Sequence, residues 1–239
     1  DHLETPGHSR FDDYKYDLNY YKDYQIEWAK NYGSSSRMSL FYNNHDNPRM
    51  VSKVNPDPQY KKALSKLLCV MQFTLLGTPF VYQGDEYGLV NSPFKSMDDI
   101  NDIESINLYK ELTEKMDEKE AFKVILAGTR DHARVLLPWN ENAPIKQDMD
   151  EEIHNFYKEI ISFRKKTPAI SYGEFEVLRD KKDTFTYQRK LDGKNIIVDC
   201  NLNTGAIPAY KVSEKYKIVF LSEEGETLNS YGFRIWESC

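Results

Sequence analysis

The stretch that decides the fold is residues 38–49, MSLFYNNHDNPR. Its first five residues form a short apolar run, and polar turn residues follow at once, as in a strand that is buried on both faces. A second such run, TPFVY at residues 78–82, leads into the polar loop QGDE. Between the two runs, residues 59–76 predict a helix that Gly77 ends, because apolar residues recur there at helical spacing. Strand, helix and strand predict a βαβ unit with parallel strands and a right-handed crossover.

Further elements follow on both sides of this unit. Residues 17–31 predict a helix that ends in a turn, and residues 98–135 predict helical segments with loops. The segment EEIHNFYKEIISFRKK at residues 151–166 predicts an amphipathic helix that ends before Pro168. Beyond Gly173 the pattern changes to short β-rich pieces at residues 174–178, 184–189, 195–200, 217–221 and 231–236. We therefore expect two domains, residues 1–170 and 171–239, the second a small antiparallel β-sandwich.

Composition excludes several classes of function. The chain has 239 residues and a net charge of −6 without a block of basic residues, so we expect no nucleic-acid partner. The most apolar region, residues 64–76, is interrupted by polar residues, so no membrane-spanning helix is predicted. The three cysteines, Cys69, Cys200 and Cys239, have no C-x-x-C spacing, and we interpret them as reduced, which favours the cytoplasm. Because the sequence opens on Asp1, we also expect it to belong to a longer protein.

The four polar residues Asn43, Asn44, His45 and Asp46 follow a predicted parallel strand. Catalytic groups of α/β barrels gather at such strand ends. On composition alone an ordinary turn explains the same residues, since Asn and Asp are common in turns. The surrounding sequence is more specific than these four positions.

Residues 39–49, SLFYNNHDNPR, resemble the motif around the third catalytic carboxylate of the α-amylase family of glycoside hydrolases, family 13. Residues 77–88 resemble that family's next strand and loop. Residues 91–96 and 102–109 resemble the branch of oligo-1,6-glucosidases, dextran glucosidases and trehalose-6-phosphate hydrolases, and residues 228–236 resemble its last sandwich strand. The resemblance runs in order along nearly the whole chain.

This resemblance implies an α/β plus β fold: the C-terminal part of a (β/α)8 TIM barrel, with strands 7 and 8, followed by the β-sandwich. It implies a retaining α-glucosidase acting on α-linked gluco-oligosaccharides, in which two carboxyl groups flank the scissile bond. Asp46 matches the third carboxylate, which stabilises the transition state, and His45 matches its substrate-binding neighbour. No segment matches the nucleophilic Asp or the acid/base Glu, so we expect the chain on its own to be inactive.

Residues 130–134, RDHAR, resemble the branch's segment that supplies an arginine to the non-reducing-end glucose, and Arg134 matches that arginine. A helix arginine in a salt bridge is the simpler alternative. The sequence departs from the branch at residues 135–139, VLLPW, where Thr-Pro-Met-Gln-Trp is usual, and the loop that follows, with residues 142–145, is short. We interpret Asp85 and Glu86 as structural, with Glu86 as the anchor of the barrel rim.

The resemblance and the residue spacing predict no cofactor and no metal, because neither His132 nor His154 has ligand-like spacing. An α-gluco-oligosaccharide is the expected partner, and the open barrel edge needs a cover, either a missing N-terminal half or a second copy. Two alternatives stay open at this point. One is a non-catalytic relative such as the heavy chains of amino-acid transporters, and the other is a carbohydrate-binding or structural module.

Overall fold

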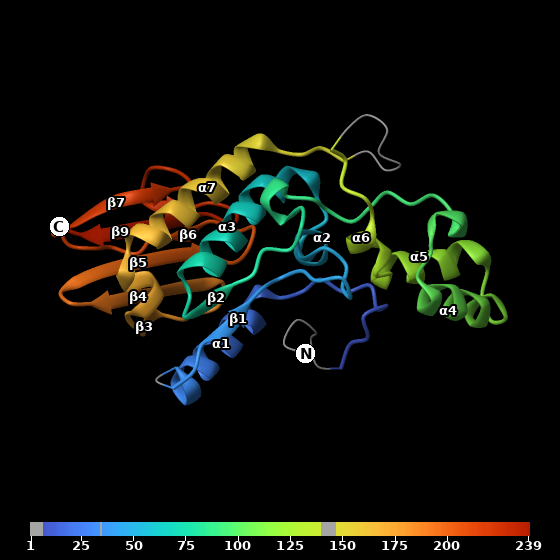
Figure 1. Cartoon of the computed structure of the whole chain (residues 1–239), viewed down its shortest axis with the longest axis horizontal. Helices are drawn as coiled ribbons and strands as arrows, with labels where there is room; N and C mark the ends of the chain where they lie inside the picture. The colour runs from blue at the N-terminus through green and yellow to red at the C-terminus, as the bar shows by residue number, and fades with distance from the viewer. Residues whose placement is uncertain (1–6, 34, 140–146) are drawn as a thin grey trace. The chain divides into compact units, whose positions relative to one another are not determined.

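The computed structural model describes residues 7–33, 35–139 and 147–239, and its helices and strands are labelled in Figure 1. By contacts between residues the chain divides into two compact units. Unit 1 contains Asp1–Tyr16, Tyr42–Asp57 and Val81–Asp150. Unit 2 contains Asp17–Phe41, Pro58–Phe80 and Glu151–Cys239.

The predicted strand, helix and strand lie in unit 2. Strands β1 (Met38–Leu40) and β2 (Gly77–Pro79) pair in parallel, as expected, and α3 (Lys61–Thr74) connects them after a 3-10 turn at Pro58–Tyr60. The helix ends at Thr74 instead of at Gly77, because Gly77 already belongs to β2. A Cβ atom on Gly77 would lie 2.4 Å from the carbonyl oxygen of Met38, so the close approach of the two strands requires glycine.

A glutamine of α3 holds the ends of both parallel strands. Gln72 is fully buried, and its Nε2 donates to the carbonyl oxygens of Leu40 at 3.1 Å and Phe80 at 2.7 Å. The amide of Phe80 also donates to the carbonyl oxygen of Leu40, at 2.9 Å. Buried carbonyl groups need such partners, so this amide fixes the points from which the loops after β1 and β2 leave the strands.

Three helices complete the α part of unit 2: α1 (Leu18–Tyr32), α7 (Glu151–Lys166) and α8 (Pro168–Tyr172). The sequence predictions for α1 and α7 are confirmed. Helices α3 and α7 lie side by side in Figure 1, and the rings of Phe73 and Tyr157 meet edge to face at 6.0 Å. Helix α7 also packs on the sheet, where Phe163 contacts Phe220.

The β-rich segment forms a five-stranded antiparallel sheet in the order β3-β4-β5-β9-β7. These strands are β3 (Glu174–Arg179), β4 (Thr184–Leu191), β5 (Lys194–Asn201), β7 (Tyr216–Leu221) and β9 (Phe233–Ser238). Two short strands, β6 (Ile207–Pro208) and β8 (Thr227–Leu228), pair separately. All five predicted strands are present. Strand β3 begins at Glu174. The expected domain boundary near residue 170 stays a prediction.

Unit 1 is built of short helices and loops. Its helices are α2 (Met50–Val54), α4 (Ile103–Thr113), α5 (Glu118–Gly128) and α6 (Asp131–Arg134), with 3-10 turns at Asp85–Tyr87 and Met97–Asp99. A small core centres on Phe94, Ile100 and Ile125. Helix α2 is absent from the sequence prediction. In the described parts of both units no helix is long and apolar enough to cross a membrane.

A buried arginine joins the helices of unit 2 to its sheet. Arg189 on β4 is fully buried and donates to the carbonyl oxygens of Thr74 and Gly173, each at 2.9 Å. Burial lowers the pKa of Arg189 to about 10, although Tyr187 nearby opposes this effect. The Tyr187 hydroxyl adds a second link, since it lies 2.5 Å from Oγ1 of Thr74. Two neighbouring polar contacts therefore hold α3 against β4.

We predict that Arg189→Ala lowers the free energy of unfolding by about 3 kcal/mol, because it leaves two buried carbonyl groups without their charged donor. The adjacent Lys190 is the matched control. It pairs with Glu176 in solvent at 2.5 Å, so Lys190→Ala should cost less than about 0.5 kcal/mol. Urea unfolding followed by circular dichroism measures both values. Equal costs for the two variants would contradict the assignment.

Candidate functional site

Two asparagines shape the loop that follows β1. Asn43 is buried, and its Nδ2 donates to Oδ1 of Asp85 at 2.7 Å while its Oδ1 accepts the amide of Met50 at 2.6 Å. The second contact caps the start of α2, which Arg49 does not cap with its side chain. Oδ1 of Asn44 accepts the amide of Asp46 at 2.8 Å, which closes a tight turn. The turn interpretation is therefore correct for these asparagines.

The next two residues of this loop point their side chains into solvent. The side chain of His45 is 70% exposed and that of Asp46 is 49% exposed, with Nε2 of His45 3.1 Å from Oδ2 of Asp46. Arg134 reaches both residues from α6. Its Nη2 donates to Oδ1 of Asp46 at 2.9 Å, and its Nε donates to the carbonyl oxygen of His45 at 2.7 Å. The structure thus brings together all three residues that the sequence analysis selected.

Two further arginines that the sequence analysis did not select surround Asp46. Arg10 donates to the carbonyl oxygen of Asp46 at 2.8 Å, and Nη1 of Arg130 lies 3.7 Å from Oδ1 of Asp46. Arg130 stands four residues before Arg134, a spacing that places two side chains on one helical face, so a signal for it was present. Nothing near Arg10 in the sequence indicates its role. Arg130 and Arg134 therefore lie at the exposed carboxylate, and Arg10 holds the backbone of the same residue.

The carboxylate that joins the two loops is Asp85, and the expectation that Glu86 anchors the barrel rim stays a prediction. Asp85 is buried and accepts from Asn43, whereas Glu86 is half-buried and, among the described residues, accepts the amide of Gly84 within its own loop, at 2.9 Å. Burial raises the pKa of Asp85 to about 7, which the neighbouring Arg49 and the hydrogen bond from Asn43 partly offset. Adjacent acidic residues look equivalent in a sequence, and only their burial distinguishes them.

Arg49 has a structural position. Its side chain is fully buried, donates to the carbonyl oxygen of Gln83 at 2.8 Å, lies 3.5 Å from Asp85 and sits over the ring of Tyr82. Burial lowers the pKa of Arg49, and the charge of Asp85 opposes that effect. It therefore supports the two loops from beneath and does not reach the exposed carboxylate.

His132, in the same short segment as Arg134, is a buried neutral residue. Its Nδ1 accepts the amide of Ser92 at 3.0 Å, and its Nε2 lies 2.8 Å from the carbonyl oxygen of Leu126, so the proton is on Nε2. Burial lowers the pKa of His132 to about 4. This histidine fastens one end of α5 to the loop after β2. Within the described residues, no group of three or more His, Cys, Asp and Glu side chains is arranged to hold a metal ion.

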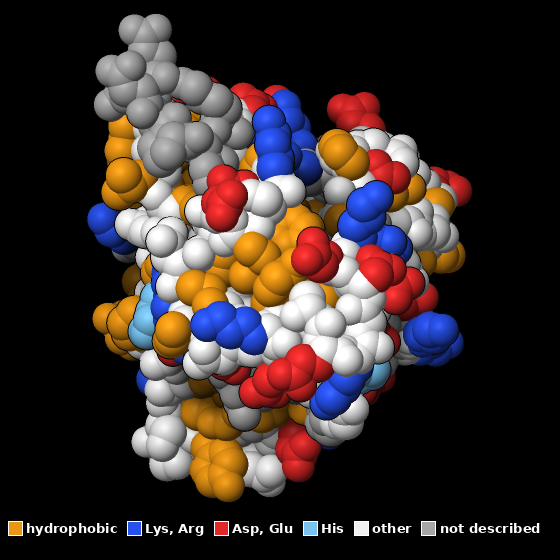
Figure 2. All heavy atoms as spheres, turned by 90° about the vertical axis from the view of Figure 1, so that its right-hand side faces the viewer, with side chains coloured by type: hydrophobic (Ala, Val, Ile, Leu, Met, Phe, Trp, Pro, Cys, Tyr) orange, Lys and Arg blue, Asp and Glu red, His pale blue; other side chains and the backbone are white. Residues whose placement is uncertain are grey.

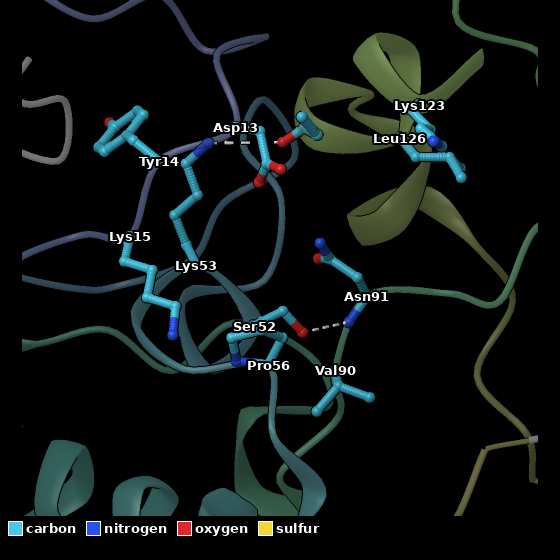
Figure 3. A pocket seen from close by; sticks show the side chains of 11 residues that line it. Asp13, Tyr14, Lys15, Ser52, Lys53, Pro56, Val90, Asn91, Lys123 and Leu126 are labelled. Atoms are coloured by element: carbon cyan, nitrogen blue, oxygen red, sulfur yellow. Dashed lines mark hydrogen bonds between the residues drawn. The ribbon is translucent and has the colours of Figure 1, made fainter. Parts of the chain in front are cut away.

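A separate hollow of about 460 Å³ lies elsewhere in unit 1 (Figure 3). Ser52, Lys53 and Asn91 line it, but their polar groups are already bonded. The Lys53 ammonium donates to the carbonyl oxygens of Arg10 and Asp12, both at 3.2 Å, and the hydroxyl of Ser52 accepts the amide of Asn91 at 2.8 Å. None of the residues selected from the sequence lines this hollow. The contacts of Ser52, Lys53 and Asn91 are therefore structural.

The charge pattern of the face in Figure 2 is mixed. On the face in Figure 2 basic and acidic side chains are interspersed, so this face has no large field of one sign.

The exposed Asp46 carboxylate is suited to accept hydrogen bonds from hydroxyl groups and to stabilise positive charge that develops close to it. The neighbouring guanidinium of Arg134 adds donors for paired oxygens. This chemistry fits a neutral, hydroxyl-rich ligand.

Comparison of the fold with solved structures defines the class. The crystal structure of the Bacillus licheniformis trehalose-6-phosphate hydrolase superposes on 99% of this chain with a TM-score of 0.88 and 23% sequence identity, and the match covers 50% of that chain. The isomaltulose synthase of Erwinia rhapontici NX5 matches 95% of this chain with a TM-score of 0.81 at 22% identity. The fold is therefore that of part of a barrel enzyme and its appended β domain.

Sequence comparison gives the family. The profile described as "Alpha amylase, catalytic domain" matches residues 3–173. The chain is 32% identical to the probable oligo-1,6-glucosidase 2 of Bacillus subtilis over 78% of its length, and 30% identical to the oligo-1,6-glucosidase of Parageobacillus thermoglucosidasius over 91%. The chain belongs to the α-amylase family. It spans 38% and 44% of the lengths of those two relatives.

We predict that His132 makes stability depend on pH in the acidic range. Its folded pKa of about 4 lies below the ordinary value of 6.5, so the unfolded chain binds more protons between these values. The neutral His132 side chain makes its full contribution to the free energy of unfolding above about pH 6.5. This contribution is lost as pH falls toward 4, a change of about 3 kcal/mol. The difference in free energy of unfolding between wild type and His132→Gln should shrink over this range.

A non-titrating substitution provides the control. Thr129 is fully buried near His132, and the gap between wild type and Thr129→Val should stay constant from about pH 7 to about pH 4. Urea titrations at each pH measure both differences. A His132→Gln gap that stays constant or grows toward acidic pH would show that this histidine is not held neutral.

Proposed function

We propose that this chain is the C-terminal portion of a retaining α-glucosidase of the oligo-1,6-glucosidase type, which hydrolyses α-linked gluco-oligosaccharides. One observation carries the proposal. This chain belongs to the α-amylase family, and its Asp46 carboxylate lies exposed in the loop after a parallel strand. Nη2 of Arg134 lies 2.9 Å from Oδ1 of Asp46, and Nε2 of His45 lies 3.1 Å from Oδ2. Similarity to two oligo-1,6-glucosidases supports the substrate class.

In this proposal Asp46 stabilises the transition state. Retaining glycosidases pass through an oxocarbenium-like state, and a fixed carboxylate beside the sugar ring binds that positive charge more tightly than it binds the neutral ground state. His45 donates a hydrogen bond to a sugar hydroxyl. Arg134 presents forked N–H donors that fit two neighbouring oxygens, while its other contacts orient Asp46.

The remaining parts of the machinery come from outside these residues in this proposal. The nucleophilic Asp and the acid/base Glu lie on earlier barrel strands, residues 1–170 supply strands 7 and 8, and residues 171–239 form the β-sandwich. The chain covers 50% of the trehalose-6-phosphate hydrolase structure that it matches, which supports this arrangement. We also propose a cytoplasmic location, since Cys69, Cys200 and Cys239 are free.

We predict that Asp46→Asn in the complete gene product lowers kcat on p-nitrophenyl α-glucoside by about 100-fold or more, because the amide keeps the shape and removes the charge. Asp98→Asn is the matched control, since Asp98 is an exposed carboxylate of the same unit that makes no hydrogen bond or ion pair with His45, Asp46 or Arg134 among the described residues. It should leave kcat unchanged. Circular dichroism confirms that both variants fold.

Three results would contradict the proposal. Turnover by Asp46→Asn at the wild-type rate would remove Asp46 from the transition state. A complete gene product with no α-glucosidase activity on isomaltose, maltose or p-nitrophenyl α-glucoside would instead favour a non-catalytic relative. Binding of isomaltose without turnover, measured by calorimetry, would identify a binding module.

We predict that Arg134→Lys raises KM for isomaltose about tenfold or more. Lysine keeps the positive charge but loses the planar fork, so it cannot hold Asp46 and the carbonyl oxygen of His45 together while it contacts two sugar oxygens. Arg37→Lys serves as a control, because Arg37 is an exposed arginine of unit 2 whose hydrogen bonds within the described residues go to the backbone carbonyl groups of Gly33 and Ser36. Steady-state kinetics measure both variants, and an unchanged KM for Arg134→Lys would exclude the substrate contact.

A further inference from the structure

We propose that Arg130 is a positioning residue, which together with the buried carboxylate of Asp102 holds Asp46 and Arg134 in the geometry that the sugar requires. The inference rests on the proposed function and assigns it two residues that the motif resemblance does not. Four contacts support it, and they lead from the interior of unit 1 outward to the exposed carboxylate.

The first contact is a buried ion pair. The side chain of Asp102 is fully buried at the start of α4, and Arg130 bonds to Oδ1 of Asp102 through both Nε, at 3.0 Å, and Nη2. Ser105 donates to the other oxygen at 2.8 Å. Burial alone would raise the pKa of Asp102, but the bonds from Arg130 and Ser105 hold it at about 2. The carboxylate is therefore charged at any pH at which such an enzyme works.

The second contact fixes the backbone around Asp102. Oδ2 of Asp131 accepts the amides of Asn101 and Asp102, at 2.6 Å and 2.8 Å. Asp131 directly follows Arg130, so one short segment supplies both the guanidinium that binds the Asp102 side chain and the carboxylate that binds its backbone. Side chain and main chain of Asp102 are thus held by adjacent residues, and the ion pair has little freedom to rearrange.

The third contact reaches the exposed site. Nη1 of Arg130 lies 3.7 Å from Oδ1 of Asp46, and Nη1 of Arg134 lies 4.0 Å from Oδ1 of Asp102. Two guanidinium groups therefore lie between an inner carboxylate, Asp102, and an outer one, Asp46. Without Asp102 these like charges would repel each other, and Arg134 would lose part of what keeps it turned toward Asp46.

The fourth contact holds the backbone of the loop. Arg10 donates to the carbonyl oxygen of Asp46 at 2.8 Å and pairs with Glu104 at 2.6 Å, and Glu104 lies 3.4 Å from Arg130. Asp46 is thus tied through its main chain and its side chain to one network of arginines and carboxylates. Asp102 lies at the buried end of this network.

The distances from the two arginines to Asp46 leave the carboxylate able to bind a sugar, as a positioning role for Arg130 requires. Arg134 is within hydrogen-bond distance of Asp46, whereas Arg130 at 3.7 Å attracts Oδ1 without a bond to it. The oxygens of Asp46 keep free lone pairs for the hydroxyl groups of a sugar. Since a displacement of about 1 Å can cost about 100-fold in rate, a carboxylate that is half exposed needs such support.

We predict that Arg130→Ala in the complete gene product lowers kcat on p-nitrophenyl α-glucoside by about tenfold or more and raises KM less than Arg134→Lys does, because Arg134 keeps its own bonds to Asp46 and His45. Guanidinium ion at about 10 mM should restore a large part of the lost rate, because the truncated side chain leaves a partly open space beside Asp102 that this ion fits. Arg37→Ala, on the surface of unit 2, should lose no rate and gain none from guanidinium. Methylammonium, which lacks the planar fork, should rescue Arg130→Ala poorly.

Asp102→Asn separates charge from shape. The amide keeps the size of the side chain, removes the inner negative charge and leaves one oxygen for the donors Ser105 and Arg130, so kcat should fall and guanidinium should give no rescue. Arg130→Gln replaces Arg130→Ala if the alanine variant does not fold, with the same fall in kcat expected. A wild-type kcat in folded Arg130 variants would overturn the inference. So would variants that lose thermal stability but show neither a fall in kcat nor a gain in rate from guanidinium. A wild-type protein without α-glucosidase activity would overturn the proposed function itself.

Discussion

The buried carboxyl group of Asp85 is the contact on which the geometry of the site depends. It accepts Nδ2 of Asn43 at 2.7 Å and lies beside the buried guanidinium of Arg49, while Asn43 also caps α2 through the amide of Met50. The buried contact between Asp85 and Asn43 therefore joins the loop after β1 to the loop after β2 and to helix α2. The cost of burying this group is visible in its pKa, which burial raises to about 7.

Outward from Asp85, buried polar side chains of the site hold exposed polar side chains in place. In the segment of residues 130–134, Asp131 and His132 face inward and bond to the backbone, whereas Arg134 faces outward to Asp46. Arg130 stands between the two layers and touches both carboxylates. This short segment thus carries buried residues with structural contacts next to the proposed site residue Arg134.

Local pattern accounts for most of the fold. The parallel strands, α7 and the five strands of the antiparallel sheet follow from apolar spacing, which depends only on neighbours in the sequence. Helix α2 does not, because the group that caps it is the side chain of Asn43, seven residues before Met50. Similarly, Asp85 and Glu86 are adjacent acidic residues, and only packing puts the first in the interior and leaves the second half-exposed.

From the sequence alone, the spacing of apolar residues predicted the order of most elements, and the resemblance to the α-amylase family selected His45, Asp46 and Arg134. Only the tertiary structure decided what surrounds them. Arg134 and Asp46 are 88 residues apart, Arg130 and Asp102 are 28 apart, and Arg10 meets Asp46 across 36. Such pairs form because packing brings separate segments together, and no periodicity within one segment encodes the distance between two of them.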